Sequence, residues 1–172
     1  MPLFHATTSI EKLDQPKTAH VRTLTEIQAR IDKEFDQHRP DATLSRSGAL
    51  FAGDDPPFCA AYLVTERRTA TDAIHIYRVE MSAPIKHPMC LADYTKHFLE
   101  DKATLTKIIR EYWIPTASWK CWEYLASSMT PVAMEPTPDA NAIAGARFRY
   151  GADLDLARRL WPIQNNRIMR QL

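Results

Sequence analysis

Apolar and polar residues alternate in several short stretches of this chain, and such alternation predicts β-strands. The clearest stretch covers residues 74–81, which read Ile-His-Ile-Tyr-Arg-Val-Glu-Met. Shorter apolar or alternating stretches predict further strands at residues 2–6, 49–52, 121–126, 131–134 and 147–150.

Apolar residues that recur every three or four positions predict helices between these strands. Residues 24–38 show this spacing, with Leu24, Ile27, Ile31 and Phe35 on one side. Thr23 and Thr25, each followed three residues later by Glu or Gln, are capping-box signals for the start of this helix.

Three further helices follow from similar signals. Asp54 or Asp55 is predicted to cap a helix whose first turn holds two prolines, where the missing N–H costs little. Residues 91–112 are predicted to be mostly helical, and a last helix is predicted to begin at Asp153. The prolines at the two ends of residues 84–88, and those within residues 135–145, predict loops.

The predicted helices cluster and do not alternate regularly with the strands. This order favours an α+β fold over a doubly wound α/β fold. With 172 residues, the chain is predicted to be one domain, 1–172, with a core at about 2–135 and a C-terminal strand and helix at about 146–172.

Composition excludes several classes of protein. The formal net charge of +1 makes no general case for nucleic acid or a membrane surface as partner. The four glycines form no Gly-x-Gly-x-x-Gly or Gly-Lys-Ser/Thr loop, which argues against the common dinucleotide-binding fold and against a nucleoside triphosphatase. No apolar run is long enough to span a bilayer, so no membrane partner is expected.

Three widely spaced cysteines do not indicate a disulfide framework. We therefore expect a cytoplasmic protein, or one delivered into the cytoplasm of a target cell.

Three short motifs carry the candidate chemistry of the chain. The first, Leu-Phe-His-Ala-Thr, is a predicted strand that carries His5. The second runs from the predicted strand Ala-Leu-Phe-Ala into a helix that carries Tyr62. The third, Trp-Glu-Tyr-Leu-Ala, is a predicted strand that carries Glu123.

In this order, His5, Tyr62 and Glu123 resemble the His-Tyr-Glu signature of the diphtheria-toxin-like and poly-ADP-ribose-polymerase-like ADP-ribosyltransferases. The resemblance covers roughly residues 2–130 and is closest to bacterial toxin and effector members. It implies split, mixed or antiparallel β-sheets with flanking helices. It also implies that the chain is a mono-ADP-ribosyltransferase that uses NAD as substrate and passes ADP-ribose to a macromolecule.

The resemblance also implies a role for each site residue. Glu123 would bind the 2′-hydroxyl of the nicotinamide ribose and stabilise the cation that forms when nicotinamide leaves. Tyr62 would stack on the nicotinamide ring. His5 would bind a ribose hydroxyl of the adenosine half, and the backbone of Ala6 would pair with the nicotinamide amide.

Three further residues complete the expected NAD site. Thr7 and Phe51 belong to the first and second motifs, and Arg46 would pair with a pyrophosphate oxygen. Ala6 stands where the family has glycine, and Cys59 stands where many members have a serine that holds the carboxamide. These departures leave a catalytically inactive binding module as an alternative.

Other functions fit the residues of this sequence less well. A related class transfers an RNA 2′-phosphate to NAD, but it relies on arginines and has no catalytic glutamate. His87 and Cys90 lack a second close pair of ligands, so no metal site is predicted. Cys59 near a helix start has no nucleophile motif around it, which argues against a cysteine hydrolase.

The acceptor is only partly defined by the sequence. Arginine-modifying relatives carry a second glutamate two residues before the catalytic one, and Cys121 stands there in this chain. We therefore expect another protein side chain or a nucleic acid, the latter suggested by six arginines from Arg147 onward. The aromatic residues of segment 110–119 are candidates to contact that acceptor. A toxin-like member would also have a cognate immunity or antitoxin protein as partner.

Overall fold

The computed structural model describes residues 1–18, 24–40, 43–66 and 68–163. Within them, seven strands form one sheet in the order β2-β7-β4-β1-β3-β6-β5, and every neighbouring pair is antiparallel. The strands are β1 (Leu3–Thr7), β2 (Lys17–Thr18), β3 (Leu50–Gly53), β4 (His75–Met81), β5 (Ile85–Pro88), β6 (Trp122–Ala126) and β7 (Ser128–Glu135).

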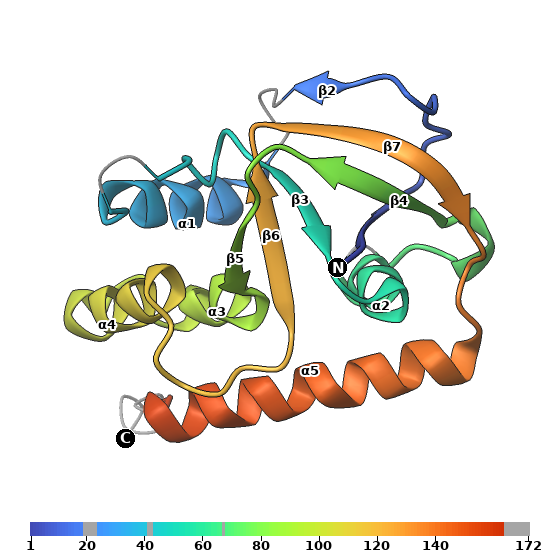
Figure 1. Cartoon of the computed structure of the whole chain (residues 1–172). Coiled ribbons are helices and arrows are strands. Elements are labelled where there is room, and N and C mark those ends of the chain that lie inside the picture. Colours follow the sequence, from blue (N-terminus) through green and yellow to red (C-terminus); the bar gives the residue numbers. More distant parts are fainter. Residues whose placement is uncertain (19–23, 41–42, 67, 164–172) are drawn as a thin grey trace.

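Five α-helices within the described residues cover this sheet (Figure 1). Helix α5 runs along the base of the molecule, and α2 lies between α5 and the strands, while α1, α3 and α4 gather on one side. The helices are α1 (Glu26–Gln37), α2 (Pro56–Glu66), α3 (Met89–Tyr94), α4 (Lys102–Trp113) and α5 (Ala140–Leu160), with short 3-10 turns at Thr71–Ala73 and Thr95–His97. An antiparallel sheet with separate helices agrees with the predicted α+β class.

Backbone pairing within the sheet is shortest between β1 and β3. These strands share a single residue pair, Phe4 with Gly53, whereas β1 and β4 are paired along the whole of β1. His5 Nδ1 donates to the Phe51 carbonyl at 2.9 Å across the opening. The expectation was split sheets of mixed or antiparallel strands. The structure has instead one antiparallel sheet that opens at this joint.

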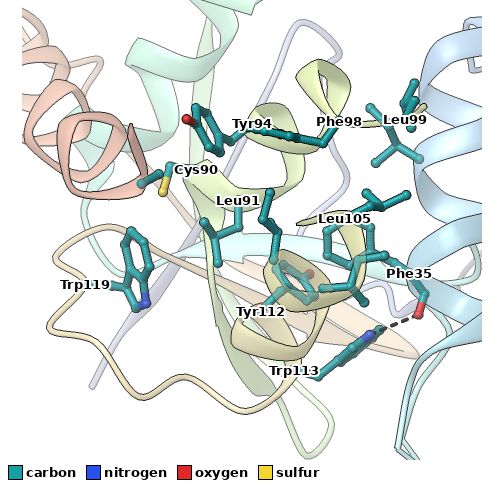
Figure 2. Close-up of a cluster of buried hydrophobic side chains, with 14 residues drawn as sticks. Phe35, Cys90, Leu91, Tyr94, Phe98, Leu99, Leu105, Tyr112, Trp113 and Trp119 are labelled. Atoms are coloured by element: carbon teal, nitrogen blue, oxygen red, sulfur yellow. Dashed lines mark hydrogen bonds between the residues drawn. The ribbon is translucent and has the colours of Figure 1, made fainter. Parts of the chain in front are cut away.

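The largest buried cluster lies among helices α1, α3, α4 and α5 (Figure 2). Phe35 from α1 packs edge-on against Tyr112 and Trp113 from α4. The Trp113 indole N–H donates to the Phe35 carbonyl at 3.0 Å, which satisfies the one polar group of that ring. This cluster fixes α4 against α1 and thereby fixes the side chains that α4 sends toward the sheet.

Local signals predicted the first helix well. The Thr25 hydroxyl accepts from the Gln28 amide at 3.3 Å, and the Gln28 side chain accepts from the Thr25 amide at 3.1 Å. This reciprocal pair is the expected capping box. Ile31 and Phe35 are buried as predicted, although Ile27 is largely exposed.

The C-terminal prediction was wrong. Residues 140–145 were expected to be loop and 147–150 to be a strand, but both lie inside α5, which begins long before Asp153. The Asp139 carboxylate accepts from the Ala142 amide at 2.8 Å and starts the helix there. Both prolines precede this cap and so leave the alanine-rich segment free to form a helix.

Two middle segments also differ from expectation. The expected loop at 84–88 contains β5, which is an edge strand. One proline precedes this strand and the other is its last residue, positions where a proline costs no hydrogen bond between strands. The expected helix at 91–112 is divided into α3 and α4 by a 3-10 turn. Asp101 then caps α4 through the Thr104 amide at 3.1 Å.

The helical assignment of residues 140–160 can be tested by substitution. Gly145 and Gly151 lie within α5, and an added Cβ at either meets no described atom within 4 Å. We expect Gly145→Ala and Gly151→Ala each to raise the free energy of unfolding by about 0.5–1 kcal/mol, measured by urea denaturation. Gly53→Ala is the control and should destabilise, since its Cβ would lie 2.7 Å from Cys59 Sγ. Destabilisation by Gly145→Ala would contradict a helix here.

Candidate active site

A cavity of about 230 Å³ opens where β1 and β3 diverge. Six of the seven residues predicted to bind NAD or act on it line this cavity: His5, Ala6, Arg46, Phe51, Tyr62 and Glu123. Thr7 is not among the lining residues, and its hydroxyl accepts from the Ser9 amide at 3.1 Å. The structure therefore brings the three sequence motifs to one place.

Strand order explains this convergence. Gly53 in β3 pairs with Phe4 on one side and with Glu123 on the other, so the first and third motifs flank the second. Helix α2 follows β3 and carries Tyr62 over the same opening. Only a glycine at position 53 leaves room for the Cys59 sulfur of that helix. No role was predicted for Gly53, although a glycine at the end of a strand signals a close approach of another segment.

The Glu123 carboxylate is 5% exposed and is held by two donors on the same oxygen. Tyr112 Oη donates to Glu123 Oε1 at 2.7 Å, and Arg46 Nη1 donates to the same oxygen in an ion pair. Arg46 Nε donates to Asp32 Oδ1 at 3.0 Å. One buried cation thus lies between two buried carboxylates, an arrangement called here the Arg46 network (Asp32, Arg46, Tyr112 and Glu123).

Burial and these contacts set the charge states. Burial raises the pKa of Glu123, and the Arg46 charge and the Tyr112 hydrogen bond act against that rise. Burial also works against the charge of Arg46, but Glu123, Tyr112 and Asp32 hold its pKa well above the usual value. Arg46 therefore stays charged, and it favours the ionised form of Glu123.

His5 is held as a neutral imidazole. Burial lowers its pKa, against a smaller opposite effect of the bond to the Phe51 carbonyl. Because Nδ1 donates to that carbonyl, the proton of the neutral ring lies on Nδ1 and Nε2 is an acceptor. A neutral His5 of this tautomer can accept a hydrogen bond from a sugar hydroxyl.

Cys59 also lines the cavity, as a protonated thiol. Its Sγ donates to the Phe4 carbonyl at 3.3 Å, and burial raises its pKa to about 12. A thiol in this state is a poor nucleophile, which argues further against a cysteine hydrolase.

Arg46 lies differently from expectation. It was expected to reach a pyrophosphate oxygen from a loop, but it is 8% exposed and bound to Asp32 and Glu123. A pyrophosphate would have to share this guanidinium with two carboxylates. No local pattern in the sequence predicts that Tyr112 binds Arg46 and Glu123, because these partners lie 66 and 11 residues away.

The segment before Glu123 also differs from expectation. Its aromatic residues were candidates to contact an acceptor, but Tyr112, Trp113 and Trp119 are buried in the cluster of Figure 2. The Glu111 carboxylate accepts from the Thr116 and Ala117 amides, the Thr116 hydroxyl and the Trp119 indole, all within 2.9 Å. These bonds fix the segment against α4, so its aromatic rings do not offer a stacking surface.

A scan against models of protein families, a search of curated proteins and a search of solved structures each found no match to this chain. Within the described residues, no group of three or more His, Cys, Asp and Glu side chains is placed to hold a metal ion. No helix in the described part of the chain has the length and apolarity to cross a membrane. What the site can do is therefore inferred from its own residues.

His87 lies beside the Arg46 network and is 1% exposed. It pairs with Glu123 across β5 and β6, its ring stacks on Tyr112 at 4.6 Å, and its Nδ1 donates to the Tyr112 carbonyl at 3.0 Å. Nε2 is buried and has no hydrogen-bond partner among the described residues. Burial, aided by the Arg46 charge, lowers the pKa of His87 to about 4.

This depressed pKa predicts a loss of stability in mild acid. Between pH about 6.5 and about 4 the unfolded chain binds a proton at His87 that the folded protein does not, so the free energy of unfolding falls as the pH falls. The loss attributable to His87 should reach roughly 2–3 kcal/mol near pH 4.5. Urea denaturation at pH 8 and pH 4.5 measures it. His87→Asn keeps a donor for the Tyr112 carbonyl and should lose less stability than the wild type. An equal loss in both proteins would contradict the assignment.

Proposed function

We propose that this protein is an NAD-dependent mono-ADP-ribosyltransferase. It cleaves the bond between nicotinamide and ribose and transfers ADP-ribose to a macromolecule. The observation that carries the proposal is the cavity at the β1–β3 joint, which His5, Tyr62 and Glu123 line together although they come from three distant segments. Their order alone suggested this chemistry, and their convergence in one cavity supports it.

The charge of the site favours a reaction that develops positive charge. The Arg46 network holds one cation and two carboxylates, Asp32 and Glu123, so it carries one negative charge in excess when both are ionised. Such a site stabilises an oxocarbenium-like ribose better than it binds an added phosphate anion. This balance argues against the alternative of an RNA 2′-phosphotransferase, which must bind a phosphate group.

The size of the cavity suggests which part of NAD enters it. About 230 Å³ lies just below the roughly 300–1,000 Å³ of pockets that enclose a drug-sized ligand. Nicotinamide and its ribose are the part that this volume suits, with the Tyr62 ring available to cover the nicotinamide face. The rest of the dinucleotide then lies toward the mouth.

The chemical step follows from this placement. The C1′–N bond breaks, and its electron pair goes to nicotinamide, whose ring nitrogen becomes neutral. The ribose is left with cationic character, which the Glu123 carboxylate stabilises. A lone pair of the acceptor then forms the new bond to C1′, and the acceptor's proton passes to Glu123 or to solvent.

The acceptor proposed is a protein side chain other than arginine, with a nucleic acid second. Cys121, two residues before Glu123, is buried, and burial raises its pKa to about 12. It offers neither a negative charge nor an exposed surface to a guanidinium. As a toxin or effector, the protein would act in a cytoplasm and would have a cognate immunity or antitoxin protein.

One observation favours a second candidate, an NAD-binding module without catalysis. Glu123 is nearly buried, and its ion pair with Arg46 offsets the charge that catalysis requires. The two candidates differ in one product, because only the enzyme releases nicotinamide.

The role of Glu123 is tested by Glu123→Gln. We expect this variant to fold and to bind NAD, because its amide oxygen can still accept from Tyr112 and Arg46 stays paired with Asp32. It should release nicotinamide at least about a hundredfold more slowly, because a neutral amide cannot stabilise the ribose cation. Chromatographic assay of nicotinamide gives the rate, and calorimetry gives NAD binding.

Glu80→Gln, on an exposed position of β4, is the matched control and should leave the rate unchanged. Full activity in Glu123→Gln would exclude Glu123 as the catalytic carboxylate. A wild-type protein that binds NAD without releasing nicotinamide would support the binding module.

A further inference from the structure

We propose that Tyr112 is a positioning residue for the proposed reaction, which presents the Glu123 carboxylate to the cavity by holding one of its two oxygens. The inference rests on the proposed function. It extends the site to a residue of α4 that does not line the cavity and belongs to the buried helical cluster.

Both side-chain hydrogen bonds that Glu123 accepts fall on one carboxylate oxygen, Oε1. Tyr112 Oη donates to Oε1 at 2.7 Å, and Arg46 Nη1 donates both to Oε1 and to Tyr112 Oη. Among the side-chain hydrogen bonds between described residues, none falls on Oε2. Because Glu123 itself lines the cavity, Oε2 is the oxygen available to a ribose hydroxyl.

The Tyr112 ring is fixed on three sides. It stacks on His87 with ring centres 4.6 Å apart, and it meets Phe35 edge-on at 4.5 Å and Trp113 edge-on at 5.0 Å. The side chain is fully buried, and Figure 2 shows the ring within the packed cluster. Because the ring is already fixed, its hydroxyl can hold the Glu123 carboxylate in place with little further loss of conformational entropy. Such preorganisation of a catalytic group speeds the reaction.

The phenol also favours the ionised carboxylate. The charged and titratable groups that act on Glu123 come from several elements, and they are Arg46 before β3, His87 of β5, Cys90 and Asp93 of α3 and Tyr112 of α4, with Asp32 of α1 bound to Arg46. Burial raises the pKa of Glu123, and Asp93 adds to that rise, whereas Arg46 and the Tyr112 hydrogen bond lower the pKa. Loss of the phenol should therefore raise the pH at which Glu123 ionises.

The test compares Tyr112→Phe with Tyr94→Phe. Tyr94 is also buried in the helical cluster, and its hydroxyl donates to the Trp161 carbonyl at 2.6 Å, away from Glu123. We expect Tyr112→Phe to lower kcat for nicotinamide release about tenfold with KM changed less than about twofold. We also expect the acid limb of its pH–rate profile to move up by about one pH unit. Tyr94→Phe should change neither, although it also removes a tyrosine hydroxyl that donates a hydrogen bond within the cluster.

A variant with both Tyr112→Phe and Glu123→Gln distinguishes the positioning of Glu123 by Tyr112 from a general loss of protein stability. If Tyr112 acts through Glu123, adding Tyr112→Phe to Glu123→Gln should lower the residual rate no further. Unchanged kcat and pH profile in Tyr112→Phe, an equal fall in Tyr94→Phe, or a further tenfold loss in the double variant would each overturn the proposal.

If the wild-type protein releases no nicotinamide from NAD, the proposed function itself is wrong. In that case, ¹³C NMR of the glutamate carboxyls still tests Tyr112. A higher titration midpoint for Glu123 in Tyr112→Phe is expected, and an unchanged midpoint would overturn the proposal.

Discussion

The ion pair between Arg46 and Glu123 is the interaction on which the rest of this structure depends. A buried charge is tolerated only when it is paired and its remaining polar atoms are bonded, and removal of one partner is strongly destabilising. Here the bonds are supplied by Asp32 of α1 and Tyr112 of α4. Because each group comes from a different element, the network ties two helices to the β6 strand and sets where the carboxylate lies.

The opening between β1 and β3 is the second constraint. Strands β1 and β3 share only one backbone pair, and the cavity lies where they are not paired. Gly53 keeps the two halves in register, since it pairs with both Phe4 and Glu123 and leaves room for α2. The Arg46 network then borders a hollow in which His5 and Tyr62 also lie. A carboxylate there can act on a bound ligand.

Elements with strong local signals could be predicted from the sequence, and those decided by distant contacts could not. The strand at 74–81 and the capping box of Thr25 both depend on neighbouring residues, and both were found. The first part of helix α5 was missed because the two prolines just before it suggested a loop and the alternation at 147–150 suggested a strand. The motif order predicted which residues would meet. The partners of Arg46 lie 14, 66 and 77 residues away, and no local pattern records such pairing.

The proposed function requires that this site break the nicotinamide–ribose bond through a ribose cation. The most direct measurement is the single-turnover rate of nicotinamide release from NAD that carries deuterium at C1′, compared with unlabelled NAD. At C1′ the bonding changes from tetrahedral toward planar as the cation forms, which loosens the out-of-plane motion of that hydrogen. We therefore expect slower release from the deuterated substrate. Equal rates for the two substrates, or no release from either, would contradict it.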